Sequence, residues 1–199
     1  MVIKRTIREQ VTREIRDELV TGSFSAGQVL REAELASRYG VSRGPIRDAF
    51  LQLSQEGLLA YQANRGVTVR DAPHPENRPF ILSLRTQIET WCVTRGLAAL
   101  TDGGLAAVEL ALISLESSCR GGNVAAIARD DMAFHEAVLI GCGGEEFVQP
   151  WRQLCSRMLL AYTRLDDYRE VYDEHAAILN PLRARDAEAV NDALHRNIA

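Results

Sequence analysis

The sequence predicts a mainly α-helical protein, with three helices and a β-hairpin at the N-terminus followed by an all-α antiparallel helical bundle. Three observations predict this fold class. Apolar residues recur at helical spacing along most of the chain, strand-like runs occur only in the first third, and three prolines interrupt residues 71–79. We therefore expect domains at residues 1–70 and 80–199, joined by a proline-rich linker at 71–79.

The N-terminal region begins with an amphipathic helix followed by a helix-turn-helix pattern. Residues 6–21 carry an apolar side chain at every fourth position, and Gly22 ends this helix. A short helical turn at residues 34–39 ends at Gly40, a typical residue after a helix C-terminus. Because another helix begins directly after this glycine, the pattern predicts a helix-turn-helix.

The helix after Gly40 has the features of a reader of the DNA major groove. Ser42 can cap its N-terminus, and Pro45 is tolerated in its first turn. Arg43 and Arg47 are four residues apart and share one face, opposite the apolar residues. Arginine binds O6 and N7 of guanine with two hydrogen bonds, so both are expected to contact bases. The alternative is a surface helix with two solvated arginines.

A predicted β-hairpin follows this helix. Strand-like runs at 57–62 and 67–70 flank a turn whose basic tip contains Arg65 and Gly66. A hairpin of this kind next to a helix-turn-helix forms a wing, so residues 1–70 are predicted to be a winged helix-turn-helix domain. We expect Arg65 and Gly66 to reach the minor groove.

Charge separates the two regions. The 199 residues have a net charge of −4, but residues 1–70 carry 11 Lys/Arg and 8 Asp/Glu, a charge of +3. The remainder carries 12 Lys/Arg and 19 Asp/Glu, a charge of −7. A weakly basic head on an acidic body is typical of a DNA-binding domain joined to a domain that does not touch DNA.

Other features of the composition indicate a cytoplasmic protein. No stretch approaches the ~18 apolar residues of a membrane span, and the N-terminus lacks the apolar core of a signal peptide. The four cysteines are scattered and form no Cys-x-x-Cys pair. We expect them to be buried thiols in a reducing compartment.

From residue 80 onward, every segment is predicted to be helical. The expected helices are 80–100, 105–119, 123–140, 145–162, one that starts after Asp166 or Asp167 and reaches Leu182, and 187–198. Pro181 should kink the fifth helix or free its last turn. Because short glycine-containing turns join these amphipathic segments, they imply an antiparallel bundle.

A candidate metal site lies in the bundle. Asp131 and His135 are spaced i, i+4, so a carboxylate and an imidazole point the same way, and His175 lies on a later helix that could cross the same interior. These residues form a plausible divalent-metal site with mixed oxygen and nitrogen ligands. The alternative is an ordinary Asp–His helical pair and an unrelated histidine.

The first region resembles the winged-helix domain of GntR-type transcriptional regulators. The similarity rests on residues 30–36, Val41–Phe50, Glu56–Leu59 and the Asn64-Arg65-Gly66 run. It implies a homodimer on an inverted-repeat operator of double-stranded DNA, with Ser42 and Gly44 close to the DNA backbone. Where some members carry a DNA-contacting arginine, this sequence has Ala33.

The second region is similar to the FCD effector domain of the FadR subgroup of these regulators. The matching strings are Asp131-Met132-Ala133-Phe134-His135, residues 173–179 and residues 183–189. The resemblance implies an all-helical domain that holds a divalent metal (Zn, Ni or Mn) on an aspartate and three histidines and binds a small carboxylate effector. Asp131, His135 and His175 match three of these ligand positions.

The fourth ligand position departs from the family pattern, because it falls on Asn197. His195 is two residues away, about 200° around the helix. Either Asn197 is a weak ligand or binds a metal-bound water, or the helix shifts and His195 takes its place. Arg85, four residues before Glu89, is a candidate partner for the effector carboxylate, and an intrahelical Arg85–Glu89 pair is the alternative.

These observations predict a ligand-responsive transcriptional regulator, expected to be a repressor, that senses a small carboxylic acid at a divalent-metal site. Two other functions stay open: a DNA-binding dimer whose bundle holds neither ligand nor metal, and a metal-dependent enzyme built on the Asp/His cluster. The sequence has neither a His-Glu-x-x-His helix nor a Gly-x-Ser-x-Gly elbow. We therefore expect no enzymatic activity and no catalytic residues.

Overall fold

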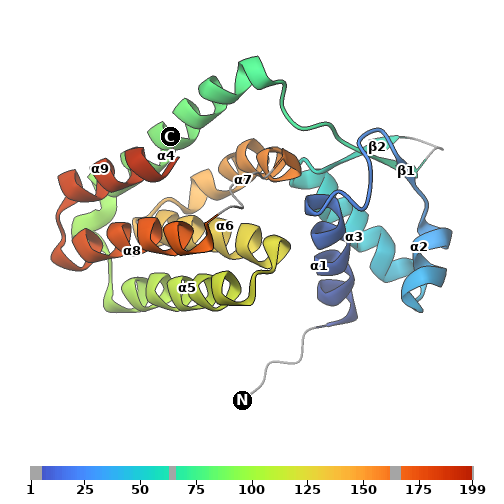
Figure 1. Ribbon diagram of the computed structural model, residues 1–199, viewed down its shortest axis with the longest axis horizontal. Coiled ribbons are helices and arrows are strands. Elements are labelled where there is room, and N and C mark those ends of the chain that lie inside the picture. The colour runs from blue at the N-terminus through green and yellow to red at the C-terminus, as the bar shows by residue number, and fades with distance from the viewer. Residues whose placement is uncertain (1–5, 63–65, 162–166, 199) are drawn as a thin grey trace. The chain divides into compact units, whose positions relative to one another are not determined.

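The computed structural model describes residues 6–62, 66–161 and 167–198 (Figure 1). The chain divides into two compact units. The first extends to Pro73 and includes Ser156–Ala161, and the second contains His74–Cys155 and the C-terminal helices. Each unit has its own hydrophobic core.

In the described residues, the first unit contains the three predicted helices and the predicted hairpin, which a third, unpredicted strand extends to a three-stranded sheet. Its elements are α1 (Ile7–Val20), β1 (Val29–Leu30), α2 (Glu32–Tyr39), α3 (Arg43–Gln55), β2 (Leu59–Gln62) and β3 (Gly66–Val69). The start of α1 is fixed by a capping box, in which Thr6 and Glu9 each bind the other's backbone N–H. Gly40 ends α2 in the left-handed conformation, with φ 66°, and this turn leads directly into α3.

The sheet is antiparallel with the order β1-β3-β2. The sequence predicts β2 and β3, whereas the two-residue β1 is expected only as an extended link. Gly66 lies where β3 meets β1, at φ 92°, and a Cβ at this position would lie 2.8 Å from the carbonyl oxygen of Leu30. The close approach of the strands therefore requires glycine.

The second unit is helical. It contains α4 (Arg78–Gly96), α5 (Asp102–Gly121), α6 (Val124–Gly141), α7 (Val148–Ser156), α8 (Tyr168–Ala184) and α9 (Ala187–Ile198), with short 3₁₀ turns at Pro75–Asn77, Leu97–Ala99 and Glu145–Phe147. The 3₁₀ turn that follows α7, Arg157–Ala161, is grouped with the first unit. Helix α5 packs against α6 and α8, which lie beside it in Figure 1, and α9 packs against α4 and α8. The predicted fold class is confirmed.

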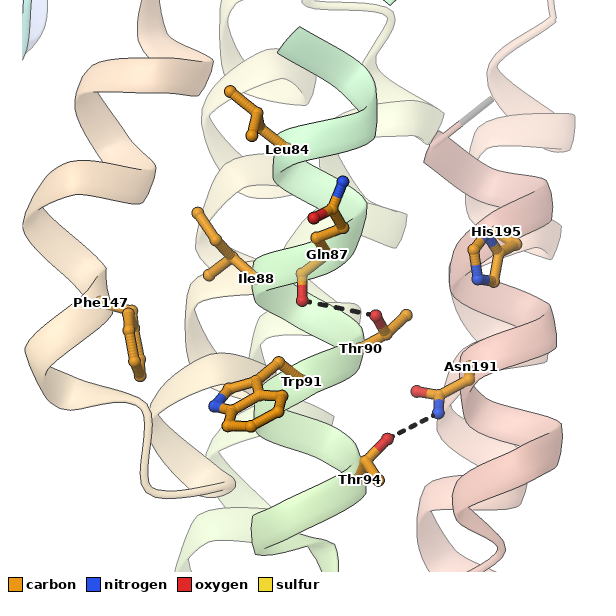
Figure 2. Close-up of a pocket in the computed structure, with 9 residues that line it drawn as sticks. All are labelled: Leu84, Gln87, Ile88, Thr90, Trp91, Thr94, Phe147, Asn191 and His195. Carbon is orange, nitrogen blue, oxygen red and sulfur yellow. Dashed lines mark hydrogen bonds between the residues drawn. The ribbon is translucent and has the colours of Figure 1, made fainter. Parts of the chain in front are cut away.

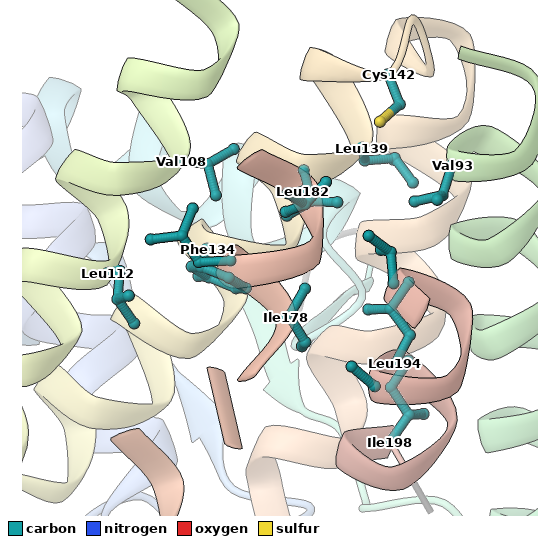
Figure 3. Close-up of a cluster of buried hydrophobic side chains, with 14 of the residues drawn as sticks. Val93, Val108, Leu112, Phe134, Leu139, Cys142, Ile178, Leu182, Leu194 and Ile198 are labelled. Carbon is teal, nitrogen blue, oxygen red and sulfur yellow. The ribbon is translucent and has the colours of Figure 1, made fainter. Parts of the chain in front are cut away.

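The core of this unit joins side chains from several helices. Figure 3 shows Phe134 of α6 near Ile178 and Leu182 of α8, with Leu194 of α9 farther along the same cluster. Another close contact is made by backbone alone, because a Cβ on Gly96 of α4 would overlap the carbonyl group of Cys142 at the end of α6.

The single helix predicted at 145–162 is wrong. The segment forms a 3₁₀ turn, then α7, then a second 3₁₀ turn, and Tyr162 lies outside the described residues. Pro150 explains the late start of α7, because proline fits the first turn of a helix but not its interior. Helix α4 similarly begins at Arg78 and holds Pro79 in its first turn.

Helix α8 continues through Pro181 and ends one turn later at Ala184. Asp167 caps its N-terminus and accepts hydrogen bonds from two backbone N–H groups. None of the helices in the described ranges is long and apolar enough to span a lipid bilayer.

Candidate functional site: a DNA-binding helix and a buried Asp/His cluster

The predicted recognition helix α3 has one buried side and one exposed side. Ile46, Ala49, Phe50 and Leu53 are buried in the first unit's core. Ser42 is the N-cap residue, but its side chain makes no capping hydrogen bond within the described structure. The predicted hydroxyl cap is therefore not formed, although the helix begins where the sequence indicates.

Arg43 and Arg47 both lie exposed on α3. Arg47 makes two parallel hydrogen bonds to Glu32 of α2, from Nε to Oε1 at 2.9 Å and from Nη2 to Oε2 at 2.8 Å. These hydrogen bonds lower the pKa of the Glu32 carboxyl, as does the charge of Arg43 nearby. The sequence gives no signal for this pair, because its members are fifteen residues apart on two different helices.

The other residues predicted to contact DNA differ in their surroundings: Gly44 is expected near the DNA backbone, and Arg65 and Gly66 in the minor groove. Gly44 lies in the first turn of α3, and a Cβ built there meets no heavy atom of the described chain within 4 Å. This turn is therefore open to a partner. Gly66 has a structural role beside Leu30, and Arg65 lies outside the described residues.

The second unit brings Asp131, His135 and His175 together. Nε2 of His135 lies 3.8 Å from Oδ1 of Asp131, and Nε2 of His175 lies 3.8 Å from Oδ2. One ligand atom from each residue lies within 4.8 Å of the others. Both histidines are fully buried and Asp131 is 5% exposed, so this cluster is in the interior of the unit.

Both imidazoles are held by their Nδ1 atoms. Nδ1 of His175 lies 2.7 Å from the carbonyl oxygen of Val171, and Nδ1 of His135 lies 2.8 Å from Oε2 of Glu89. Since these oxygens accept hydrogen bonds, the tautomer with hydrogen on Nδ1 fits both histidines. Each Nε2 then presents a lone pair toward Asp131, and neither Nε2 has a hydrogen-bond partner among the described residues.

The electrostatic surroundings of these residues favour the protonation states in which a carboxylate or an imidazole can bind a metal ion. Burial would raise the pKa of Asp131, but the imidazole of His175, together with His135 and Arg85, holds it well below its usual range. Burial lowers the pKa of His135, which favours neutral imidazole. A carboxylate and two neutral imidazoles, with each outer nitrogen held by an acceptor, form a donor set that suits Zn²⁺, Ni²⁺ or Mn²⁺.

Glu89 of α4 connects this cluster to two neighbouring helices. Besides His135, its carboxylate accepts hydrogen bonds from Nε of Arg85 and Nε1 of Trp151, each at 2.8 Å. Burial would raise the pKa of Glu89, but its interactions with His135 and Arg85 lower it to about 2. The i, i+4 spacing in the sequence predicts the Arg85–Glu89 pair. The sequence does not predict that His135 and Trp151 also bind Glu89.

Arg85 is nearly buried and only partly bonded. Its Nε binds Glu89, while its Nη2 is buried without a hydrogen-bond partner in the described part of the chain. The positive charge of Arg85 also acts on Asp131 and lowers that residue's pKa. A buried guanidinium with a free donor near the Asp/His cluster is suited to bind an anion.

Asn197 and His195 lie on opposite sides of α9. Asn197 is 2% exposed, donates to Oε2 of Glu174 at 3.2 Å, and lies 3.5 Å from Nδ1 of His175, on the ring edge away from Asp131. His195 is exposed and lines a separate groove of about 760 Å³ between α4 and α9. Figure 2 shows His195 and Asn191 facing Thr90 and Thr94 across this groove.

A winged helix-turn-helix with exposed arginines, joined to a helical domain with a buried polar cluster, defines a class of DNA-binding transcriptional regulators. Residues 7–69 match the family described as bacterial regulatory proteins, gntR family, and residues 81–199 match the FCD domain. The chain belongs to the GntR family, and its second unit contains an FCD domain. This family assignment confirms a regulator rather than an enzyme.

Known relatives align along nearly the whole chain. This chain is 26% identical over 215 residues to the "Probable D-xylose utilization operon transcriptional repressor" of Paenarthrobacter nicotinovorans. The alignment covers 98% of this chain and 89% of that protein. The fold of this chain is similar to that of E. coli McbR/YncC, with a TM-score of 0.75 and 22% identity over 98% of this chain and 94% of that chain. A GntR regulator from Rhodococcus sp. RHA1 has a TM-score of 0.72 and 25% identity, covering 96% and 93%.

Proposed function

We propose that this protein is a cytoplasmic, homodimeric repressor of the FadR subgroup that binds an inverted-repeat operator. Its affinity for this operator changes when a small carboxylic acid binds at a divalent-metal site. The observation that carries the sensing part is the pair of orphaned Nε2 atoms on His135 and His175, both directed at Asp131. Leaving two buried nitrogen atoms unpaired is costly unless something binds them.

The metal in this proposal is held by Asp131, His135 and His175. It supplies a positive charge in the bundle interior, which a carboxylate can neutralise. Asn197 contributes its amide group only indirectly, because it lies beside Nδ1 of His175 and not beside Nε2. We expect weaker metal binding than at a site with four protein ligands, since one coordination position is left to water or effector.

Arg85 is the proposed second contact for the effector. Its unpaired Nη2 can donate a hydrogen bond to a carboxylate, and burial strengthens such a charge-assisted contact. Glu89 fixes the other edge of the guanidinium. A ligand with one carboxylate between the metal and Arg85 would thus be bound by two positive groups.

Operator binding is proposed to use Arg43 and Arg47 for base contacts, Ser42 and Gly44 for the DNA backbone, and the wing tip with Arg65 and Gly66 for the minor groove. Effector binding would change the relative population of DNA-competent dimers. The supporting observations are the exposed face of α3 and the open turn at Gly44.

The test compares three proteins: wild type, Asp131→Asn/His135→Ala, and the control His195→Ala. Each is stripped of metal, incubated with Zn²⁺, Ni²⁺ or Mn²⁺, and measured by elemental analysis, then screened by thermal shift against small organic acids. We expect wild type and the His195 variant to bind about one metal ion per chain and the double variant to bind none. Equal metal content and equal ligand response in all three would contradict the proposed site.

A further inference from the structure

The contact between Glu32 and Arg47 joins the two helices of the helix-turn-helix. Glu32 is the first residue of α2, and its two carboxylate oxygens accept from Nε and Nη2 of Arg47 at 2.9 and 2.8 Å. The side chain of Arg47 is 64% exposed and that of Glu32 is 31% exposed. The pair thus lies on the exposed surface of the DNA-binding domain.

This contact leaves most of the guanidinium free. A guanidinium has five N–H donors, and the carboxylate uses the one on Nε and one on Nη2. Three donors remain, and one on Nη1 and the second on Nη2 lie side by side on the Nη1–Nη2 edge. Two parallel donors on that edge have the geometry that binds O6 and N7 of guanine. Glu32 and a guanine can therefore bind Arg47 at the same time.

We propose that Glu32 is a positioning residue for base recognition: it holds Arg47 by its Nε edge, so that the Nη1–Nη2 edge is fixed for one guanine of the operator. This inference rests on the proposed role of Arg47 in operator binding. Ordering a long side chain before binding lowers the entropy lost when the complex forms. Glu32 would thereby increase discrimination between base pairs.

The charge of Glu32 has the opposite effect on general DNA affinity. A carboxylate near phosphates repels them, so removing it should strengthen binding to any sequence. Positioning and repulsion can therefore be separated. Glu32→Gln should lower the preference for the correct base pair while leaving non-specific affinity unchanged or higher.

Glu34→Gln is a matched control on the same helix. Glu34 is paired only loosely with Arg31, at 3.7 Å, and their side chains are 66% and 71% exposed. This substitution removes one negative charge from α2 without touching Arg47. Any change common to both variants reports charge, and a change confined to Glu32→Gln reports positioning.

The experiment begins with selection of an operator from randomised duplex DNA by the wild-type protein. Arg47→Ala then identifies the base pair whose preference is lost. Affinity of Glu32→Gln and Glu34→Gln is measured on the operator and on a duplex changed at that base pair, and thermal unfolding checks that both variants fold. We expect Glu32→Gln to lower the preference about fivefold, and Glu34→Gln to keep it within about twofold.

The outcomes are distinguishable. If wild type selects no sequence, operator binding itself is contradicted, and if Arg47→Ala loses no preference, the role of Arg47 is contradicted. Either result would also contradict the inference about Glu32, because that inference depends on the role of Arg47. If Arg47→Ala loses the preference but Glu32→Gln behaves like Glu34→Gln, then the positioning role alone is overturned.

Discussion

Single residues on the first turns of α3 decide what this helix can contact. Arg43, Gly44 and Arg47 are exposed, while Ile46 on the other side is fully buried. Exposed side chains at such a position contribute little to folding, so substitutions there should change binding more than stability.

Arg47→Ala should weaken operator binding by about 1–3 kcal/mol and relax the preference at one base pair, because it removes a bidentate contact. The measurement is a titration of operator and altered duplexes at fixed salt. Arg13→Ala on α1, which removes the same charge from a pair with Asp17, is the control. Equal losses in both variants would show that Arg47 contributes charge only.

Gly44→Ala should separate folding from binding. Alanine favours helix over glycine by up to about 1 kcal/mol, and open space surrounds this position, so the melting temperature should stay the same or rise. Operator affinity should fall by about 1 kcal/mol if a DNA phosphate approaches this turn and one hydrogen bond is lost. An unchanged affinity would remove Gly44 from the proposed interface.

At the level of secondary-structure elements, helix ends with a strong local signal were predictable, whereas α5 begins at Asp102 and not at the expected residue 105. Gly40, Asn123 and Asp167 each carry a local stop or start signal, and each lies at the helix end that the sequence indicates. These signals act through neighbouring backbone groups, so they need no tertiary context.

Elements and contacts that depend on distant residues could not be predicted in the same way. Strand β1 has only two residues and exists because β3 pairs with it. The apolar spacing of 145–162 predicts one helix, but Pro150 limits where α7 can start.

The candidate site likewise combines local features, which the sequence predicts, with contacts between distant residues, which it does not. The i, i+4 spacing of Asp131 and His135 is readable in the sequence, and the resemblance to the FCD domain points to His175. The anchoring of His135 by Glu89 joins residues 46 positions apart, so only the packed bundle reveals it.

Gly40→Ala tests the turn between α2 and α3. Gly40 has φ 66°, which alanine adopts at a cost of about 1 kcal/mol, and no neighbouring atom adds a clash. Urea unfolding followed by a probe in the first unit should show this loss, whereas Gly44→Ala in the same unit should show none. An unchanged free energy of unfolding in Gly40→Ala would contradict the left-handed conformation assigned to Gly40.

For the molecule as a whole, burial of the cysteines should make the folded state less stable at alkaline pH. All four are free and buried in the described structure, as expected. Burial raises the pKa of Cys142 to about 11 and that of Cys155 to about 12. Above about pH 9 the unfolded chain loses these protons and the folded chain keeps them, so stability should fall as pH rises.

Urea unfolding at pH 8 and pH 10 checks this expectation. Wild type should lose about 2–3 kcal/mol more than a Cys142→Ala/Cys155→Ala variant over this interval. A thiol reagent at pH 8 should react slowly with native protein and completely in denaturant. Rapid reaction of all four thiols in native protein would show that these side chains are accessible.

The backbone contact between Gly96 and Cys142 sets a narrow limit on sequence variation in this bundle. Even one methyl group at residue 96 would force the end of α4 away from α6, and no rotamer can relieve a clash of Cβ with a carbonyl. A library randomised at residue 96 and sorted for folded protein should therefore return glycine almost alone. The same library at Gly121, where a Cβ meets open space, should return many residue types.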